Sequence, residues 1–224
     1  MNTGKIKGAI FDIDGTLIDS MPIWVTVADR YLESQGKQAE PNIVEKVFSM
    51  TMEQSAAYMQ EYYGVKKTVS EIKQGFIEVV ADFYKYEVKL KPGAKDFLFE
   101  LDKRNVPMVL ATVGDADLAS YALNRLGIEK YFKDLLTAKD FCTDKTEPTI
   151  YLKAAECIGC KPRETAVFED VVHGLDTAGK ADFITVAVED EASFKDRKKI
   201  EAVSDFYLKT YYDFRINPGF QVFD

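Results

Sequence analysis

Short apolar runs alternate with longer amphipathic segments along most of this 224-residue chain. Runs typical of buried strands lie at 6–11, 108–112, 135–138, 166–168 and 184–188, with a weaker one at 206–208. Between them lie segments with apolar residues at helical spacing, among them 93–104, 116–126 and 150–157. Strands that alternate with helices form βαβ units, whose parallel sheet is covered by helices on both faces. The sequence therefore predicts an α/β fold with a doubly wound parallel sheet.

One interval interrupts this alternation. From about residue 20 to residue 88 no strand pattern occurs, and helical patterns lie at 23–35, 41–48, 52–63 and 69–86. Pro92 and Gly93 mark the return to the alternating pattern. We therefore expect two domains: a sheet domain formed by 1–19 and 88–224, and an inserted all-helical domain at 20–87. The two crossings between them, near 18–21 and 86–91, are expected to act as hinges.

Two carboxylates stand at the point where the first apolar run stops. Asp12 and Asp14 follow the run 9–11 and precede Gly15 and Thr16. Ligands of open α/β sheets bind beyond the carboxyl ends of the strands. Two acids placed there repel each other unless a cation lies between them. Mg²⁺ is a hard cation that prefers oxygen ligands, so the sequence predicts a metal-dependent site.

The run from Asp12 to Leu17, DIDGTL, resembles the nucleophile motif of the haloacid dehalogenase superfamily, in its phosphatase and phosphomutase branch. Thr112, Lys145 and the pair Glu169-Asp170 follow in the order of the other motifs of that superfamily. The resemblance extends from residue 7 to about residue 208. It implies a Rossmannoid core with a helical type-1 cap, in the subfamily similar to phosphoglycolate phosphatase and β-phosphoglucomutase.

The resemblance also implies a role for each matched residue. Asp12 matches the nucleophile that forms an aspartyl-phosphate, and Asp14 matches the general acid and base. The groups expected to bind the phosphate are the Thr112 hydroxyl, the backbone N–H groups of Val113 and Gly114, and the Lys145 ammonium.

The same resemblance implies a Mg²⁺ site. Asp12 and Asp170 would bind the ion through their carboxylates, and Asp14 through its backbone carbonyl. Glu169 would bind the ion directly or orient the water molecules around it.

Three residues of the helical insert give information about the class of substrate. Trp24 stands where the β-phosphoglucomutase branch has a histidine, and the position of a loop arginine falls at about Met52. Thr16 and Leu17, which that branch often replaces, are intact. These three differences argue against a sugar phosphomutase. Trp24, with Met50 and Met52, could line an apolar lid over the substrate or belong to the core of the insert.

These observations favour a Mg²⁺-dependent phosphatase that hydrolyses phosphate monoesters of small metabolites. Two alternatives stay open. One is a sugar phosphomutase of the β-phosphoglucomutase type. The other is a weakly catalytic member of the superfamily that binds a phosphorylated ligand or a partner protein.

The composition of the chain restricts which partners it can bind and in which cellular compartment it is expected. The formal net charge of −8 argues against binding to nucleic acid or to an anionic membrane surface. No apolar stretch approaches the ~18 residues of a membrane span, and the N-terminus lacks a signal-peptide pattern. Three unevenly spaced cysteines suit a reducing compartment. We therefore expect a cytoplasmic monomer that acts on a small phosphorylated metabolite.

Overall fold

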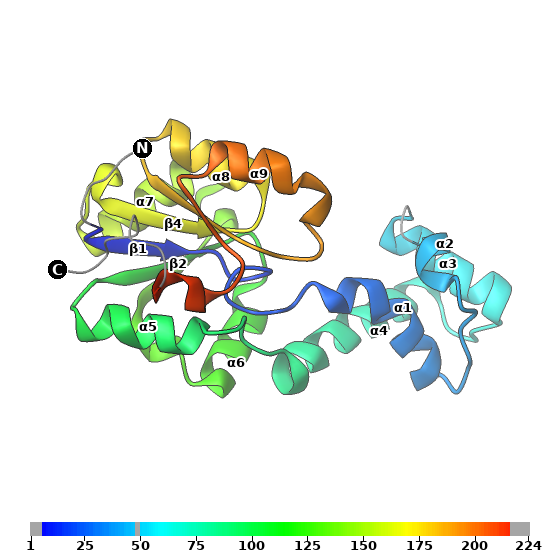
Figure 1. Cartoon of the computed structure of the whole chain (residues 1–224). Helices are drawn as coiled ribbons and strands as arrows, with labels where there is room; N and C mark the ends of the chain where they lie inside the picture. The colour runs from blue at the N-terminus through cyan, green and yellow to red at the C-terminus, as the bar shows by residue number, and fades with distance from the viewer. Residues whose placement is uncertain (1–5, 48–49, 216–224) are drawn as a thin grey trace. The chain divides into compact units, whose positions relative to one another are not determined.

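The computed structural model describes residues 6–47 and 50–215 (Figure 1). The chain divides into two compact units. The core unit consists of Met1–Asp19 and Lys89–Asp224, and the helical unit consists of Ser20–Val88. Among the described residues, no helix combines the length and the apolar character needed to cross a membrane.

The core unit contains a six-stranded sheet in which every neighbouring pair is parallel. Its strands are β1 (Gly8–Phe11), β2 (Met108–Thr112), β3 (Phe132–Thr137), β4 (Thr165–Glu169), β5 (Ile184–Val188) and β6 (Phe206–Leu208). The spatial order is β3-β2-β1-β4-β5-β6. Strand β3 starts before its predicted bounds, because it lies at a sheet edge where Lys133 and Asp134 are exposed and hide the apolar pattern. The predicted doubly wound α/β fold is confirmed.

Helices cover both faces of this sheet (Figure 1). Helices α5 (Ala94–Lys103) and α6 (Ala116–Leu126) lie on one face. The other face carries α7 (Thr149–Ile158), α8 (Val172–Lys180) and α9 (Arg197–Val203). Right-handed crossovers explain this division, because the chain moves outward from β1 to β3 and then outward from β4 to β6 in the opposite direction. The strand order thus reverses between β1 and β4, where open α/β sheets bind their ligands.

Short helical turns complete the core unit. They are η2 (Glu129–Tyr131), η3 (Ala138–Phe141), η4 (Pro162–Glu164), η5 (Phe194–Asp196) and η6 (Tyr211–Arg215).

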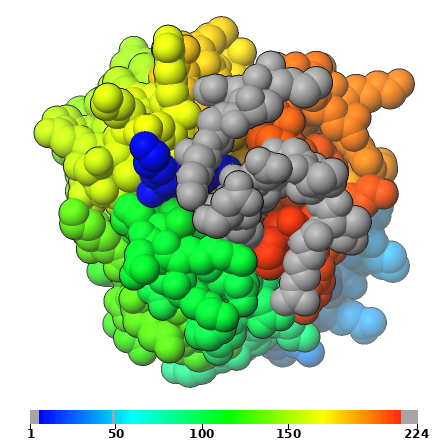
Figure 2. Space-filling model, turned by 60° about the vertical axis from the view of Figure 1, so that its left-hand side comes forward, coloured from blue at the N-terminus to red at the C-terminus, as the bar shows by residue number. Residues whose placement is uncertain are grey.

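Strand β1 is the centre of the core, and all four of its residues are buried. The ring of Phe11 stacks on that of Phe168 in β4, with centroids 4.3 Å apart. Phe97 of α5 meets Phe11 edge-on at 6.2 Å. On the opposite face, Ile10 packs in a cluster with residues of α7. In Figure 2 the start of the described chain, coloured blue, is visible only as a small patch between the green and yellow segments of the core unit.

The helical unit has a small core of its own. Its helices are α1 (Pro22–Ser34), α2 (Ile43–Val47), α3 (Met52–Tyr63) and α4 (Val69–Asp82), followed by a π-helical turn, η1 (Phe83–Glu87). The side chains of Thr51 and Thr68 start α3 and α4 with capping boxes, which satisfy the free N–H groups of the first turn. The predicted helix at 69–86 changes to the π form after Asp82, and the predicted helix at 41–48 ends with Phe48 outside the described residues.

The two crossing segments pair with each other inside the core unit. The Asp19 N–H donates to the Lys89 carbonyl at 2.8 Å, and the Lys91 N–H donates to the Leu17 carbonyl at 2.8 Å. Ile18 and Leu90 form an antiparallel bridge between these bonds. Their role as hinges stays a prediction.

Candidate active site

Three neighbouring strands deliver the predicted site residues to one edge of the sheet. Thr112 is the last residue of β2, Asp12 follows β1, and Glu169 ends β4 with Asp170 next. Strands β2, β1 and β4 are adjacent and parallel, so their carboxyl ends coincide. All four side chains are buried. The structure therefore brings together residues that lie far apart in the sequence.

A tight turn follows Asp12. The Ile13 carbonyl accepts hydrogen bonds from the N–H groups of Leu17 and Ile18, at 2.9 and 3.0 Å. Gly15 has a φ of +79°, a conformation that side chains disfavour. A Cβ atom at Gly15 would also lie 2.6 Å from Oδ2 of Asp170. Glycine is needed here because the backbone both turns and approaches the second acidic strand end.

Lys145 lies between two of the acids. Its side chain is 3% exposed, and its Nζ donates to Oδ1 of Asp12 and, at 2.5 Å, to Oε1 of Glu169. Tyr151 of α7 donates its hydroxyl to the same Oε1 at 2.9 Å. Burial lowers the pKa of Lys145, but the charges of Asp12 and Glu169 outweigh burial and raise that pKa above its ordinary value. Lys145 is therefore an ammonium ion at neutral pH.

The predicted phosphate-binding segment follows β2. The Gly114 N–H donates to Oγ1 of Thr112 at 2.9 Å, and the Thr112 hydroxyl keeps its own proton to donate elsewhere. A Cβ atom at Gly114 would lie 2.8 Å from Oδ2 of Asp14, so glycine lets the Asp14 carboxylate approach this segment. Val113 is 62% exposed. Asp115 caps α6, accepting from the Leu118 N–H at 3.0 Å.

Three carboxylates form a compact acidic cluster. Asp12, Glu169 and Asp170 each offer an oxygen, and these oxygens lie within 4.8 Å of one another. Burial raises the pKa of Asp12 well above its ordinary value, although Lys145 opposes the rise. Burial, together with the negative charges of Glu169 and Asp190, raises the pKa of Asp170 to about 7. The three acids of the cluster therefore share the single positive charge of Lys145.

A divalent cation fits this cluster. Three carboxylates meet here, the negative charge of Asp14 also acts on Asp12, and the single Lys145 ammonium faces two of the three acids. The donors are oxygens, which Mg²⁺ and Ca²⁺ prefer. The cluster could therefore bind a metal ion through Asp12, Asp170 and Glu169. The predicted use of the Asp14 backbone carbonyl stays a prediction.

Several residues that have no predicted part in the site also contact it. Thr16 Oγ1 donates to Oδ1 of Asp170 at 3.1 Å, and Ser193 Oγ donates to Oδ2 at 3.3 Å. Tyr151 contacts Glu169 from a helix whose spacing predicted only core packing. Gly174 of α8 lies so close to Glu169 that a Cβ atom there would be 2.7 Å from Cδ of Glu169. Of these residues, only Gly174 has a signal in the sequence, because a glycine inside a helix can mark a close contact.

Trp24 lies in the helical unit. Its side chain is 49% exposed, and it lines an apolar cavity of about 240 Å³ together with Met50 and Met52. Ala28 and Phe76 contribute to the same wall. The structure thus gathers these three side chains at one cavity, whereas their part in substrate binding stays a prediction.

Comparisons with known proteins agree with this geometry. The chain is 26% identical over 176 residues to a phosphorylated carbohydrates phosphatase of Thermotoga maritima, covering 79% of this chain and 82% of that protein. It is 29% identical over 192 residues to a probable pseudouridine-5'-phosphatase of Drosophila melanogaster, covering 83% of each chain. A crystal structure of a provisionally named β-phosphoglucomutase from Thermotoga maritima superposes with a TM-score of 0.78, at 24% identity, covering 91% of this chain and 94% of that one.

The family comparison covers most of the chain. Residues 9–188 match the family described as haloacid dehalogenase-like hydrolase. This range includes the turn after β1, the end of β2, Lys145 and the acidic end of β4. The chain belongs to the haloacid dehalogenase-like hydrolase family.

Proposed function

We propose that this protein is a Mg²⁺-dependent phosphatase that hydrolyses phosphate monoesters of small metabolites through an aspartyl-phosphate on Asp12. One observation carries the proposal. Asp12 is a buried carboxylate bound to Lys145 and placed within an acidic cluster at the carboxyl edge of the sheet. Two of the relatives named above are a phosphorylated carbohydrates phosphatase and a probable pseudouridine-5'-phosphatase, which supports the reaction type and leaves the metabolite open.

The proposed reaction has two steps. In the first step an oxygen of Asp12 forms a bond to phosphorus while the bond from phosphorus to the leaving oxygen breaks. Protonated Asp14 gives its proton to that leaving oxygen. In the second step a water molecule attacks the aspartyl-phosphate and gives a proton to Asp14, and the bond from Asp12 to phosphorus breaks. Inorganic phosphate leaves, and both acids return to their starting states.

Lys145 and Thr112 are suited to bind the phosphate. An ammonium group carries three N–H donors, and Asp12 and Glu169 accept from two of them. The third can donate to a phosphate oxygen. The Thr112 hydroxyl accepts from Gly114 and can donate its proton to the same group. Backbone N–H groups at Val113 and Gly114 are proposed to contribute, for which the Gly114 N–H must leave its present bond to Thr112.

Asp12, Asp170 and the Asp14 backbone carbonyl are proposed to bind Mg²⁺, with Glu169 as a further ligand or as a partner of its water molecules. The family is metal-dependent, and the acidic cluster could bind such an ion. A bound Mg²⁺ supplies positive charge that offsets the negative charge of the phosphate oxygens. Glu169 also positions Lys145, because its Oε1 accepts from Nζ at 2.5 Å.

Residues 20–87 are proposed to act as a cap that excludes water while Asp12 is phosphorylated. Trp24, Met50 and Met52 are proposed to contact the part of the substrate that departs as an alcohol. The apolar cavity that these side chains line supports this proposal.

The mutase alternative is less favoured. Trp24 stands where the resemblance to mutases predicts a histidine, and the named relatives include phosphatases. A purely binding role is disfavoured because Asp12, Asp14 and Lys145 are all present.

A panel of phosphorylated metabolites with Mg²⁺ separates these functions. Fast release of inorganic phosphate supports the phosphatase. Conversion to an isomer with little phosphate release would indicate a mutase, and neither product would indicate a binding protein. The matched control is Asp12→Asn, purified in the same way, which reveals any contaminating phosphatase.

We further propose that the enzyme is a cytoplasmic monomer without nucleic-acid partners. The net charge of −8 supports the absence of nucleic acid, and the three free cysteines suit a reducing compartment. Light scattering after size-exclusion chromatography tests the oligomeric state.

A further inference from the structure

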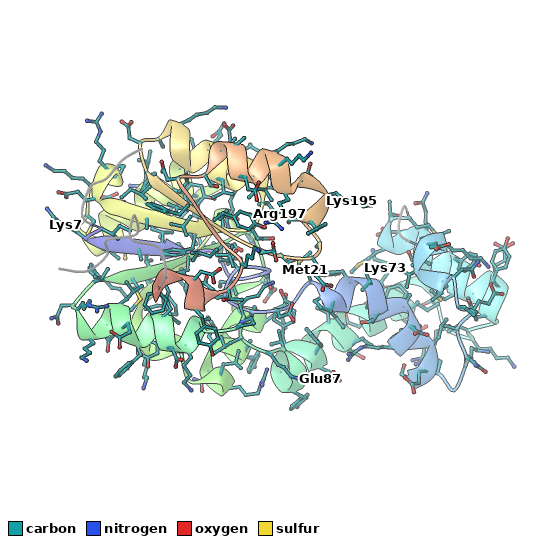
Figure 3. The ribbon with its side chains drawn as sticks, viewed as in Figure 1. Lys7, Met21, Lys73, Glu87, Lys195 and Arg197 are labelled. Carbon is teal, nitrogen blue, oxygen red and sulfur yellow. The ribbon has the colours of Figure 1, made fainter. Side chains whose placement is uncertain are left out.

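The loop that follows β5 reaches the acidic cluster. It spans residues 189–193, just beyond the range 9–188 that matches the family. Its last residue, Ser193, donates its hydroxyl to Oδ2 of Asp170 at 3.3 Å, while Thr16 donates to Oδ1 at 3.1 Å. Each oxygen of the Asp170 carboxylate therefore accepts a hydroxyl hydrogen bond. Lys195 and Arg197, labelled in Figure 3, mark the segment that continues from this loop into α9.

The buried carboxylate of Asp190 holds this loop in place through hydrogen bonds. Its side chain is 2% exposed, and its carboxylate accepts from Lys91 Nζ at 2.5 Å and from the Ala192 N–H at 2.8 Å. Lys91 Nζ also donates to the Glu189 carbonyl at 3.2 Å. One lysine thus binds both of the residues with which the loop begins.

Lys91 connects the loop to the tight turn that follows Asp12. Its backbone N–H donates to the Leu17 carbonyl at 2.8 Å, and Leu17 belongs to the turn that follows Asp12. A buried carboxylate without its cationic partner is strongly destabilising, so the contact with Lys91 holds Asp190 in this position. The pair therefore fixes the loop, and with it Ser193, relative to the turn that carries Asp12.

We propose that Ser193 is a positioning residue for metal binding and that the Lys91–Asp190 pair acts through it. The Ser193 hydroxyl restricts the rotation of the Asp170 carboxylate, so that its remaining lone pairs face the cation. This inference rests on the proposed metal site. Outer partners of metal ligands typically change metal affinity ~10–100-fold when removed.

The first test measures Mg²⁺ affinity of the full-length metal-free protein by isothermal titration calorimetry. Ser193→Ala should raise the Kd for Mg²⁺ about 10-fold or more, and Ser193→Thr, which keeps the hydroxyl, should restore most of the affinity. The matched control is Ser204→Ala, because among the described residues the buried Ser204 hydroxyl has no hydrogen-bond partner. Wild-type affinity in Ser193→Ala would overturn the inference.

A double-mutant cycle tests the route through Ser193. Lys91→Met should weaken Mg²⁺ binding, and the combined variant Lys91→Met/Ser193→Ala should bind no more weakly than Ser193→Ala alone. Losses that simply multiply would contradict the proposed route. If circular dichroism shows that Lys91→Met does not fold, Asp190→Asn takes its place in the cycle.

Asp170→Asn separates failure of the inference from failure of the metal site. If Asp170→Asn loses Mg²⁺ binding while Ser193→Ala keeps it, only the role of Ser193 is wrong. If Asp170→Asn binds Mg²⁺ as well as the wild type, the proposed metal site and the inference both fail. None of these measurements depends on phosphatase activity.

Discussion

Replacing Gly174 in α8 by alanine should displace the carboxylate that positions Lys145. The new Cβ atom would lie 2.7 Å from Cδ of Glu169 and 2.9 Å from the Tyr151 hydroxyl oxygen, distances at which one group must move. The end of a flexible side chain usually moves at little cost. Glu169, however, is fully buried and accepts from Lys145 at 2.5 Å and from Tyr151 at 2.9 Å. Movement therefore weakens hydrogen bonds to a buried charge.

Gly179 of the same helix supplies the matched control. A Cβ atom at Gly179 would lie 3.6 Å from Cγ2 of Thr185, which is ordinary van der Waals contact. Alanine is favoured over glycine in a helix by up to about 1 kcal/mol, and this gain largely cancels when the two variants are compared. The remaining difference is the cost of overpacking at Gly174, about 1–3 kcal/mol.

Thermal denaturation and phosphate release together test this reasoning. A difference of 1 kcal/mol shifts the Tm of a chain of this size by about 2–4 °C, so Gly174→Ala should melt about 2–12 °C below Gly179→Ala. Gly174→Ala should also release phosphate more slowly, because displacement of Glu169 disturbs Lys145. Equal melting temperatures with full activity in both variants would refute the claim that Glu169 occupies a fixed position.

Three further predictions concern the metal, the acidic cluster and the helical unit. Excess EDTA should abolish turnover, and added Mg²⁺ should restore it. Ca²⁺ should substitute poorly, because it accepts more ligands in a looser arrangement than Mg²⁺ does. Full activity in excess EDTA would contradict the metal requirement. In metal-free protein the pKa of Asp170 is raised to about 7, against about 3.9 when unfolded. Between these two pKa values the folded state binds more protons than the unfolded state, so the free energy of unfolding should fall from about pH 4 to about pH 7. Denaturation of Asp170→Asn at the same pH values should lack this contribution to the fall. Trp24→Ala should lower kcat/KM for a metabolite ester more than for acetyl phosphate, and equal losses with a lower Tm would assign Trp24 to the core of the helical unit.

Much of the fold could be predicted because its signals are local. The apolar run before Asp12 and the helical spacing at 116–126 depend on neighbouring residues only, and α6 occupies the same bounds in the structure. Strand β3 was harder to delimit, because exposed residues such as Lys133 carry no apolar signal. The change from α- to π-helix after Asp82 also lacks a local signature.

Some residues of the candidate site could likewise be predicted from local signals in the sequence, and others could not. Asp12, Thr112 and Asp170 could be placed together from sequence, because each stands where a predicted parallel strand ends. Tyr151 and Ser193 could not, because their contacts depend on how a helix and a loop pack against those ends. Their positions follow from tertiary packing, which no short sequence motif encodes.

A phosphoryl group on Asp12 is the intermediate on which the proposed mechanism depends, and it can be detected. Asp14→Asn should still accept phosphate from p-nitrophenyl phosphate, whose leaving group needs little protonation, but should release it slowly because no base activates the water. Acid quenching followed by peptide mass spectrometry should therefore find a phosphorylated Asp12 in Asp14→Asn, and none in the combined variant Asp12→Asn/Asp14→Asn. Near-normal phosphate release by Asp12→Asn, without phosphorylation of Asp12 in any variant, would contradict the account.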